Sequence, residues 1–70
     1  MINEQIKKEI LRIINESDNG CGWYIIEMRC RIPRSEFPAG TNIKSYIEEM
    51  IEEGKIRRDT DGKREKYTLK

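Results

Sequence analysis

The chain has no histidine, and its only two cysteines are Cys21 and Cys30. A four-ligand zinc site needs more nitrogen and sulfur donors than these two thiols supply. The cysteines are also nine positions apart, which matches no close-spaced ligand pair. We expect both to be reduced thiols that fill apolar space, with a redox sensor or a shared intermolecular cluster as alternatives. The sequence therefore predicts no metal and no cofactor.

The usual features of a catalytic site are missing as well. With no histidine and no glycine-rich phosphate loop, acid–base catalysis would depend on scattered carboxylates. A chain of 70 residues is also too small to enclose a substrate pocket easily. We therefore predict that the protein is not an enzyme.

Long apolar runs are absent too. No stretch approaches the ~20 apolar residues that a membrane helix requires. Charges at Glu4, Lys7 and Lys8 occupy the region where a signal peptide has its apolar core. These observations predict a cytoplasmic protein without a membrane partner.

The length predicts one domain covering residues 1–70, because so short a chain buries only about 60% of its unfolded surface. Twelve isoleucines against two leucines, together with a few aromatic residues, supply the core. Such a small core predicts marginal stability. A homodimer would add the buried surface that the monomer lacks.

Charge is unevenly distributed, although the net charge is only +1. Residues 29–46 carry four Lys or Arg and one Glu, and residues 47–54 carry four Glu and no cation. Residues 55–70 carry seven Lys or Arg and three Asp or Glu. The overall balance does not by itself indicate a nucleic-acid partner, but the C-terminal segment is the basic end of the chain.

Apolar residues recur at helical spacing in the first part of the chain. The isoleucines from Ile2 to Ile14 predict a helix from about Glu4 to Glu16, with Asn3 as its cap. Turn-forming residues follow at 17–20 and 22. The stretch from Trp23 to Ile32 fits either a short buried strand at 23–26 or a short helix, and we favour the helix.

Pro33, Pro38 and Gly40 predict an irregular loop over 33–40 that places Phe37 in the core. After it, Thr41 is a candidate cap for a third helix. Five apolar residues of that helix share one face, and we expect that face to be buried: Ile43, Tyr46, Ile47, Met50 and Ile51. Gly54 is placed to end the helix.

Asp61 and Gly62 form a strong signal for a two-residue hairpin turn. With these two residues in the centre of the turn, Thr60 faces Lys63. Ile56 then faces Tyr67, Arg58 faces Glu65 and Asp59 faces Arg64. This register pairs apolar residues at the base of the hairpin and opposite charges toward its tip.

The order of three helices and a basic hairpin resembles the winged-helix superfamily. The residues that carry the resemblance are 41–56, with Ile51, Gly54 and Ile56 marking the passage from the third helix into the hairpin. The resemblance implies an α+β fold, a three-helix winged helix-turn-helix with a C-terminal two-stranded β-hairpin wing. The sequence departs from many members in the longer segment between helices 2 and 3 and in the four glutamates of residues 47–54.

In this superfamily the third helix enters the major groove of double-stranded DNA and the wing contacts the adjacent backbone or minor groove. The resemblance therefore implies contacts from the start of the third helix, at Thr41, Asn42, Lys44 and Ser45. Asn can bond adenine with both amide atoms, Lys can donate to guanine or phosphate, and the hydroxyls can donate to phosphate. The alternative is that Thr41 and Asn42 only cap the helix while the other two side chains are solvated.

The hairpin supplies a second group of candidate contacts, in which cations would replace the counterions of DNA phosphates: Arg57, Lys63, Arg64 and Lys66. The alternative is that these residues only protect edge strands from aggregation. Arg29, Arg31 and Arg34 could extend the basic surface, or simply be solvated.

We therefore expect double-stranded DNA binding by a transcriptional or replication-type regulator. The four glutamates, Glu48, Glu49, Glu52 and Glu53, oppose deep insertion of the whole third helix, because carboxylates are repelled by phosphates within a Debye length of ~8 Å. The alternative is a winged-helix protein–protein interaction module, in which the acidic helix or the basic wing binds a protein partner.

Overall fold

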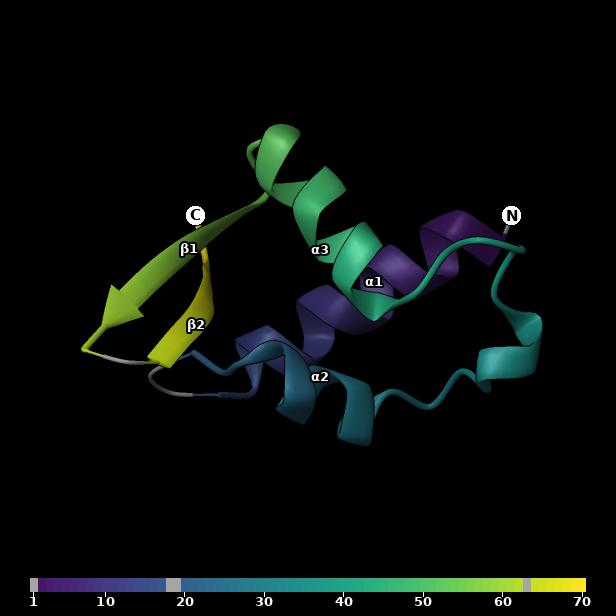
Figure 1. The fold of residues 1–70 in the computed structure, drawn as a ribbon, viewed down its shortest axis with the longest axis horizontal. Coiled ribbons are helices and arrows are strands. Elements are labelled where there is room, and N and C mark those ends of the chain that lie inside the picture. The colour runs from purple at the N-terminus through teal and green to yellow at the C-terminus, as the bar shows by residue number, and fades with distance from the viewer. Residues whose placement is uncertain (1, 18–19, 63) are drawn as a thin grey trace.

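The computed structural model describes residues 2–17, 20–62 and 64–70. The elements follow one another in the order α1 (Ile2–Asn15), α2 (Trp23–Arg29), the 3₁₀ turn η1 (Arg34–Glu36), α3 (Ile43–Glu52), β1 (Ile56–Asp61) and β2 (Arg64–Leu69). The helices lie together, and the antiparallel hairpin extends from one side of them (Figure 1). This α+β layout of three helices and a C-terminal hairpin is the one that the sequence predicts.

Helix α1 presents its isoleucine face to the core, where Ile6, Ile10, Ile13 and Ile14 are buried. The helix begins at Ile2, so the prediction that Asn3 caps it is wrong. The Oδ1 atom of Asn3 instead accepts a hydrogen bond from the Tyr46 hydroxyl at 2.5 Å. A contact with α3 thus takes the side chain that local sequence assigns to a cap.

Helix α2 confirms the helical interpretation of the ambiguous segment, and a strand at 23–26 is wrong. The helix ends at Arg29, and only Ile26 within it is buried. Extended pairing occurs two residues earlier, at Cys21. Its N–H donates to the carbonyl of Tyr67 at 3.2 Å, and its carbonyl accepts the Tyr67 N–H at 2.8 Å. This isolated bridge ties the chain before α2 to the free edge of β2.

The loop over 33–40 contains η1 and brings Phe37 against the core. The Phe37 ring is half-buried and meets the Tyr46 ring edge-on, with centroids 5.9 Å apart. Tyr46 therefore holds both the loop and the start of α1 in place.

Helix α3 begins after Asn42, not after Thr41. The Asn42 side chain accepts the N–H of Ser45 at 2.9 Å, and the Ser45 hydroxyl accepts the N–H of Asn42 at 2.8 Å. The Thr41 hydroxyl donates to the Pro38 carbonyl at 2.6 Å, so it serves the preceding turn. The predicted cap at Thr41 is wrong, because Asn42, one residue later, occupies the cap position and accepts the N–H of Ser45.

The other end of α3 stops at the predicted glycine. The Gly54 N–H donates to the Ile51 carbonyl and the Lys55 N–H to the Met50 carbonyl, both at 3.0 Å. These two bonds form the Schellman pattern that satisfies the last carbonyls of a helix. The chain then passes directly into β1.

The hairpin forms, but its predicted register is wrong by two residues. Ile56 pairs with Leu69, Arg58 with Tyr67 and Asp61 with Arg64. The turn therefore follows Asp61, and Gly62 adopts a φ of +66°, which a residue without a Cβ tolerates. A shift of two residues leaves each side chain on its original face of the hairpin.

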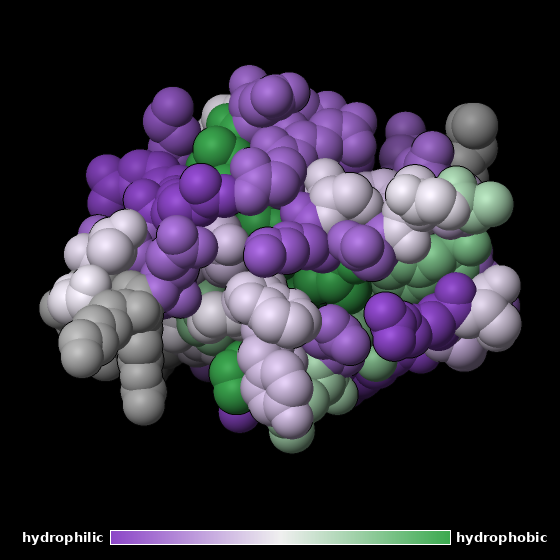
Figure 2. All heavy atoms as spheres, in the orientation of Figure 1, coloured by the Kyte–Doolittle hydropathy of each residue, from purple (hydrophilic) through white to green (hydrophobic). Residues whose placement is uncertain are grey.

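The core forms where α1, α3 and the inner face of the hairpin meet. The fully buried side chains there include Ile10 from α1, Ile47 and Met50 from α3, and Ile56 and Tyr67 from the hairpin. Most of the surface seen in Figure 2 is hydrophilic, with small apolar areas between the polar side chains. The packing of α1 and the hairpin base around α3 leaves one side of α3, the outer hairpin face and much of α2 exposed.

Candidate nucleic-acid interface

Four residues predicted to contact DNA lie at the start of α3: Lys44 and Ser45 in its first turn, Asn42 at its cap and Thr41 just before it. Three of them use their polar side chains on the local backbone: Thr41 bonds Pro38, and Asn42 and Ser45 bond each other. Asn42 and Ser45 nevertheless remain exposed. The amide nitrogen of Asn42 is the group left to donate to a ligand, because its oxygen already accepts the Ser45 N–H.

Lys44 is the exposed cation of this turn. Its ammonium nitrogen lies 5.7 Å from the centroid of the Trp23 ring, within the range of a cation–π contact. The Trp23 ring in turn meets Tyr24 edge-on, with centroids 6.0 Å apart. The first residues of α2 are therefore neighbours of the first turn of α3.

Two hollows flank the aromatic pair. One, of about 320 Å³, is lined by Trp23, Tyr24, Glu27, Arg34, Asn42 and Lys44. The other, of about 460 Å³, is lined by residues 20–25 together with Glu65 and Lys66 of β2. The start of α3, the exposed aromatic pair and the second strand of the hairpin thus share one surface, which we call the aromatic face: Trp23, Tyr24, Arg34, Lys44 and Lys66.

Trp23 and Tyr24 were not among the residues predicted to contact DNA. As aromatic residues they were expected to help fill the core, yet Tyr24 is 62% exposed and Trp23 is 38% exposed. One feature of the sequence could have indicated their exposure: the two aromatic residues directly follow a turn and begin a helix that is too short to bury both. Only the packing of α2 shows which of its apolar residues are left outside.

The predicted wing contacts divide into two groups. Arg57 and Lys66 belong to facing strands and share the outer face of the hairpin, since Arg57 pairs with Thr68 and Asp59 with Lys66. Arg64 is the first residue of β2, and Lys63 lies outside the described residues. Asp59 lies directly across from Lys66, so the outer face carries charge of both signs.

Arg58 was not predicted as a site residue, and it lies on the inner face of the hairpin. Its guanidinium forms an ion pair with Glu48 of α3, lies 4.0 Å from Glu65 and lies 5.9 Å from the centroid of the Tyr67 ring. The nearby Tyr67 hydroxyl, followed by Glu48, raises the pKa of Arg58. Arg58 therefore links the hairpin to the middle of α3.

Lys7 of α1 holds two further glutamates. Its ammonium lies 3.2 Å from Glu49 and 3.1 Å from Glu53. The hydrogen bond to Glu53 is the largest cause that raises the pKa of Lys7. Three of the four glutamates near the end of α3 therefore have a cation partner within the chain.

Both cysteines are free, as the sequence predicts. Burial raises the pKa of the Cys21 thiol and of the Cys30 thiol. A protonated thiol is a weak nucleophile and a poor metal ligand. Cys30 also donates to the carbonyl of Ile32 at 3.7 Å, so it closes the end of α2.

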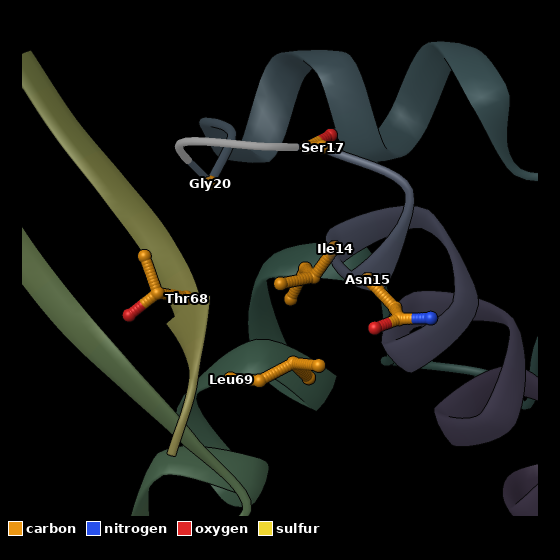
Figure 3. A pocket seen from close by; sticks show the side chains of 6 residues that line it. All are labelled: Ile14, Asn15, Ser17, Gly20, Thr68 and Leu69. Carbon is orange, nitrogen blue, oxygen red and sulfur yellow. The ribbon is translucent and has the colours of Figure 1, made fainter.

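A third hollow, of about 350 Å³, lies between the end of α1 and β2 (Figure 3). Its lining consists of Ile14, Asn15, Ser17, Gly20, Thr68 and Leu69. The Ser17 hydroxyl bonds the Ile13 carbonyl, and Thr68 turns its hydroxyl away from Ile14 and Asn15. The lining has no charged side chain and lies away from the cations of the aromatic face.

Over residues 2–17, 20–62 and 64–70, no helix is long and apolar enough to cross a bilayer. Within the same part of the chain, no group of three or more Cys, Asp or Glu side chains is arranged to hold a metal ion. Comparison of the chain with models of protein families, with curated proteins and with solved structures finds no match.

Proposed function

We propose that the chain is a winged-helix domain that binds double-stranded DNA, as a transcriptional or replication-type regulator. The first turn of α3 approaches the major groove, and the outer face of the hairpin lies along the neighbouring backbone. Lys44, Arg57 and Lys66 supply the phosphate contacts, and the contacts expected from the sequence at Lys63 and Arg64 stay a prediction.

The observation that carries the proposal is the pairing of the α3 glutamates inside the molecule. Glu49 and Glu53 lie against Lys7, and Glu48 lies against Arg58. An ion-paired carboxylate repels a phosphate less than a lone one, because the two charges nearly cancel at a distance. The main objection to placing α3 beside DNA is thereby weakened.

The same pairing weakens the alternative of a protein-interaction module that uses an acidic helix. A basic partner would have to compete with Lys7 and Arg58 for three of the four carboxylates. Glu52 is the exposed member of the group for which the structure shows no ion pair among the described residues. One carboxylate alone is a small target for a basic protein.

The test is a titration of the protein with a random-sequence duplex at several salt concentrations. We expect the logarithm of the affinity to fall linearly with the logarithm of salt, and each of Lys44→Ala, Arg57→Ala and Lys66→Ala to reduce that slope by about 1. Lys8→Ala is the matched control, because Lys8 is an exposed cation of α1, a helix that takes no part in the proposed contacts. Binding that is absent at low salt, or that is unaffected by all three substitutions, would refute the proposal.

A further inference from the structure

The aromatic face exposes two neighbouring aromatic rings, those of Trp23 and Tyr24. Tyr24 is 62% exposed and its ring stands at 87° to the ring of Trp23. The hollows on either side of the pair have volumes of about 320 and 460 Å³. Among the described residues, twelve apolar side chains are buried almost completely, yet these two rings remain in contact with water.

The charges around the two rings restrict what can cover them. Arg34 and Lys44 line one hollow, and Lys66 lines the other. In a two-fold dimer the same patch meets itself, so the three cations of each copy would gather against only two carboxylates of each copy, Glu27 and Glu65. The surrounding charge therefore favours an anionic occupant over a second copy of the chain.

We propose that the aromatic face binds an unpaired nucleotide next to the duplex, with the base stacked on Tyr24 and Trp23 and the phosphates near Arg34, Lys44 and Lys66. This inference rests on the proposed duplex binding and names the form of DNA that the same surface prefers. Exposed aromatic rings beside a basic groove are the physical basis of single-strand binding, because every base has a flat face to stack. A junction between single- and double-stranded DNA contains both a duplex and an unpaired nucleotide next to it.

Two carboxylates also line the hollows, and they fit this occupant. Glu65 lies 4.0 Å from the Arg58 guanidinium, so its charge is partly compensated. Glu27 lines the hollow beside Trp23 and Tyr24, where a carboxylate can accept a hydrogen bond from the exocyclic amino group of cytosine. Deoxycytidine is therefore the unpaired nucleotide of choice for a test.

The experiment compares a blunt duplex with the same duplex carrying a tail of about six deoxycytidines at its 3′ or its 5′ end. A third form carries a tail of the same length without bases. Trp23 is the only tryptophan of the chain, so its fluorescence reports directly on the aromatic face. We expect one of the deoxycytidine tails to tighten binding by roughly five- to tenfold and to quench Trp23, and the base-free tail to do much less.

The Tyr24→Ala variant should lose most of the gain from the tail and keep its affinity for the blunt duplex. Met28→Ala is the matched control, since Met28 is 66% exposed on the same helix but lines neither hollow. It should behave as the unsubstituted protein does. Both side chains are exposed, so neither substitution removes a core contact.

Several outcomes would overturn the inference. An equal gain from the base-free tail would mean that only phosphates are bound, and an unchanged gain in Tyr24→Ala would exclude stacking on that ring. Self-association that Tyr24→Ala abolishes would assign the face to a dimer, and quenching by a glutamate–tyrosine copolymer but not by DNA would assign it to an acidic protein. Failure of duplex binding is read separately, from the blunt duplex, while a single-stranded deoxycytidine oligonucleotide still reports on stacking through Trp23.

Discussion

The Oδ1 atom of Asn42 accepts the backbone N–H of Ser45 at 2.9 Å, and the Ser45 hydroxyl accepts the N–H of Asn42 at 2.8 Å. This reciprocal pair caps α3 at the point where the chain is proposed to meet a base. The cap and the base contact can be separated, because they use different atoms of the Asn42 amide.

Replacing Asn42 by serine should keep the cap and remove the amide nitrogen. Serine caps a helix about as well as asparagine, so stability should change by less than about 0.5 kcal/mol, whereas Asn42→Ala should cost about 1 kcal/mol. If the amide reads a base, both variants should lose about 1–3 kcal/mol of discrimination between duplex sequences. Urea unfolding and binding to a selected set of duplexes measure the two effects. A serine variant that retains full sequence preference would show that Asn42 is only a cap.

Removing Lys7 should weaken DNA binding although Lys7 lies on α1. The substitution Lys7→Gln leaves Glu49 without a cation and Glu53 with only Lys55, at 3.8 Å, so the repulsion between these carboxylates and phosphates would increase. Duplex affinity at low salt should fall several-fold, and the loss should shrink as salt screens the charges. Fluorescence anisotropy at two salt concentrations measures this.

Lys8→Gln is the control for that experiment, because it removes the same charge from the next residue of α1. Lys8 is exposed and has no ion pair among the described residues. Equal losses in the two variants would mean that net charge alone matters and that the pairing of the glutamates has no role.

Glu9 should make the stability depend on pH in the acidic range. Its carboxylate accepts Arg12 Nε at 2.7 Å and the backbone N–H of Arg31 at 2.6 Å. The hydrogen bond from Arg12 is the largest cause that lowers the pKa of Glu9, and the bond from Arg31 adds to it. A lowered native pKa stabilises the fold above the unfolded value of about 4.3, and this contribution is lost as the pH falls through the native pKa.

The substitution Glu9→Gln should therefore destabilise the protein by about 1–3 kcal/mol at neutral pH, and the difference from the unsubstituted protein should decrease below about pH 4.3. Urea midpoints measured between neutral and strongly acidic pH test this. The exposed Glu36 provides the control, as Glu36→Gln should change stability by less than about 0.5 kcal/mol. A constant difference at every pH would contradict the assignment to the charged form of Glu9.

Gly20 should tolerate substitution far less well than Gly40, although both have a positive φ. A Cβ on Gly20, at φ +79°, would lie 2.6 Å from the Tyr67 carbonyl oxygen and 2.6 Å from Thr68 Cγ2. That carbonyl is held by the Cys21 N–H, so it cannot move away freely. At Gly40, with φ +81°, the added Cβ would meet open space.

Gly40→Ala should thus cost about 1–2 kcal/mol for the left-handed backbone alone, and Gly20→Ala should cost more than that, with loss of the bridge between Cys21 and Tyr67. Urea unfolding compares the two, and amide exchange at Tyr67 reports on the bridge. Equal costs would show that the close approach of Gly20 to β2 is not present in solution.

The order of the elements could be predicted from the sequence because it depends on local patterns. The spacing of the isoleucines determined α1, the apolar face from Ile43 to Met50 determined α3, and Asp61 with Gly62 determined a hairpin. Each of these patterns spans only a few residues, so the helix or hairpin that it predicts does not depend on contacts with distant parts of the chain. The exposure of Lys44 on α3 followed from the same pattern.

Choices between local equivalents were made only in the folded chain. Thr41 and Asn42 are both good caps, and in the fold Asn42 takes the cap position while the Thr41 hydroxyl donates to the Pro38 carbonyl of the preceding turn. A hairpin shifted by two residues keeps the same inner face, so the side-chain pattern cannot distinguish the registers. The pairing of Tyr67 with Cys21, far away in the sequence, is one of the constraints that only the folded chain supplies.

The candidate site depended on tertiary structure more than the fold did. The four glutamates of residues 47–54 read as an exposed acidic stripe, but Lys7 and Arg58 come to three of them from other elements. Trp23 and Tyr24 read as core residues, but α2 is short and only Ile26 within it is buried. The sequence determines which side chains could form a site. Their burial and their ion pairs depend on which helices and strands pack together, and this packing is established only when the complete core forms.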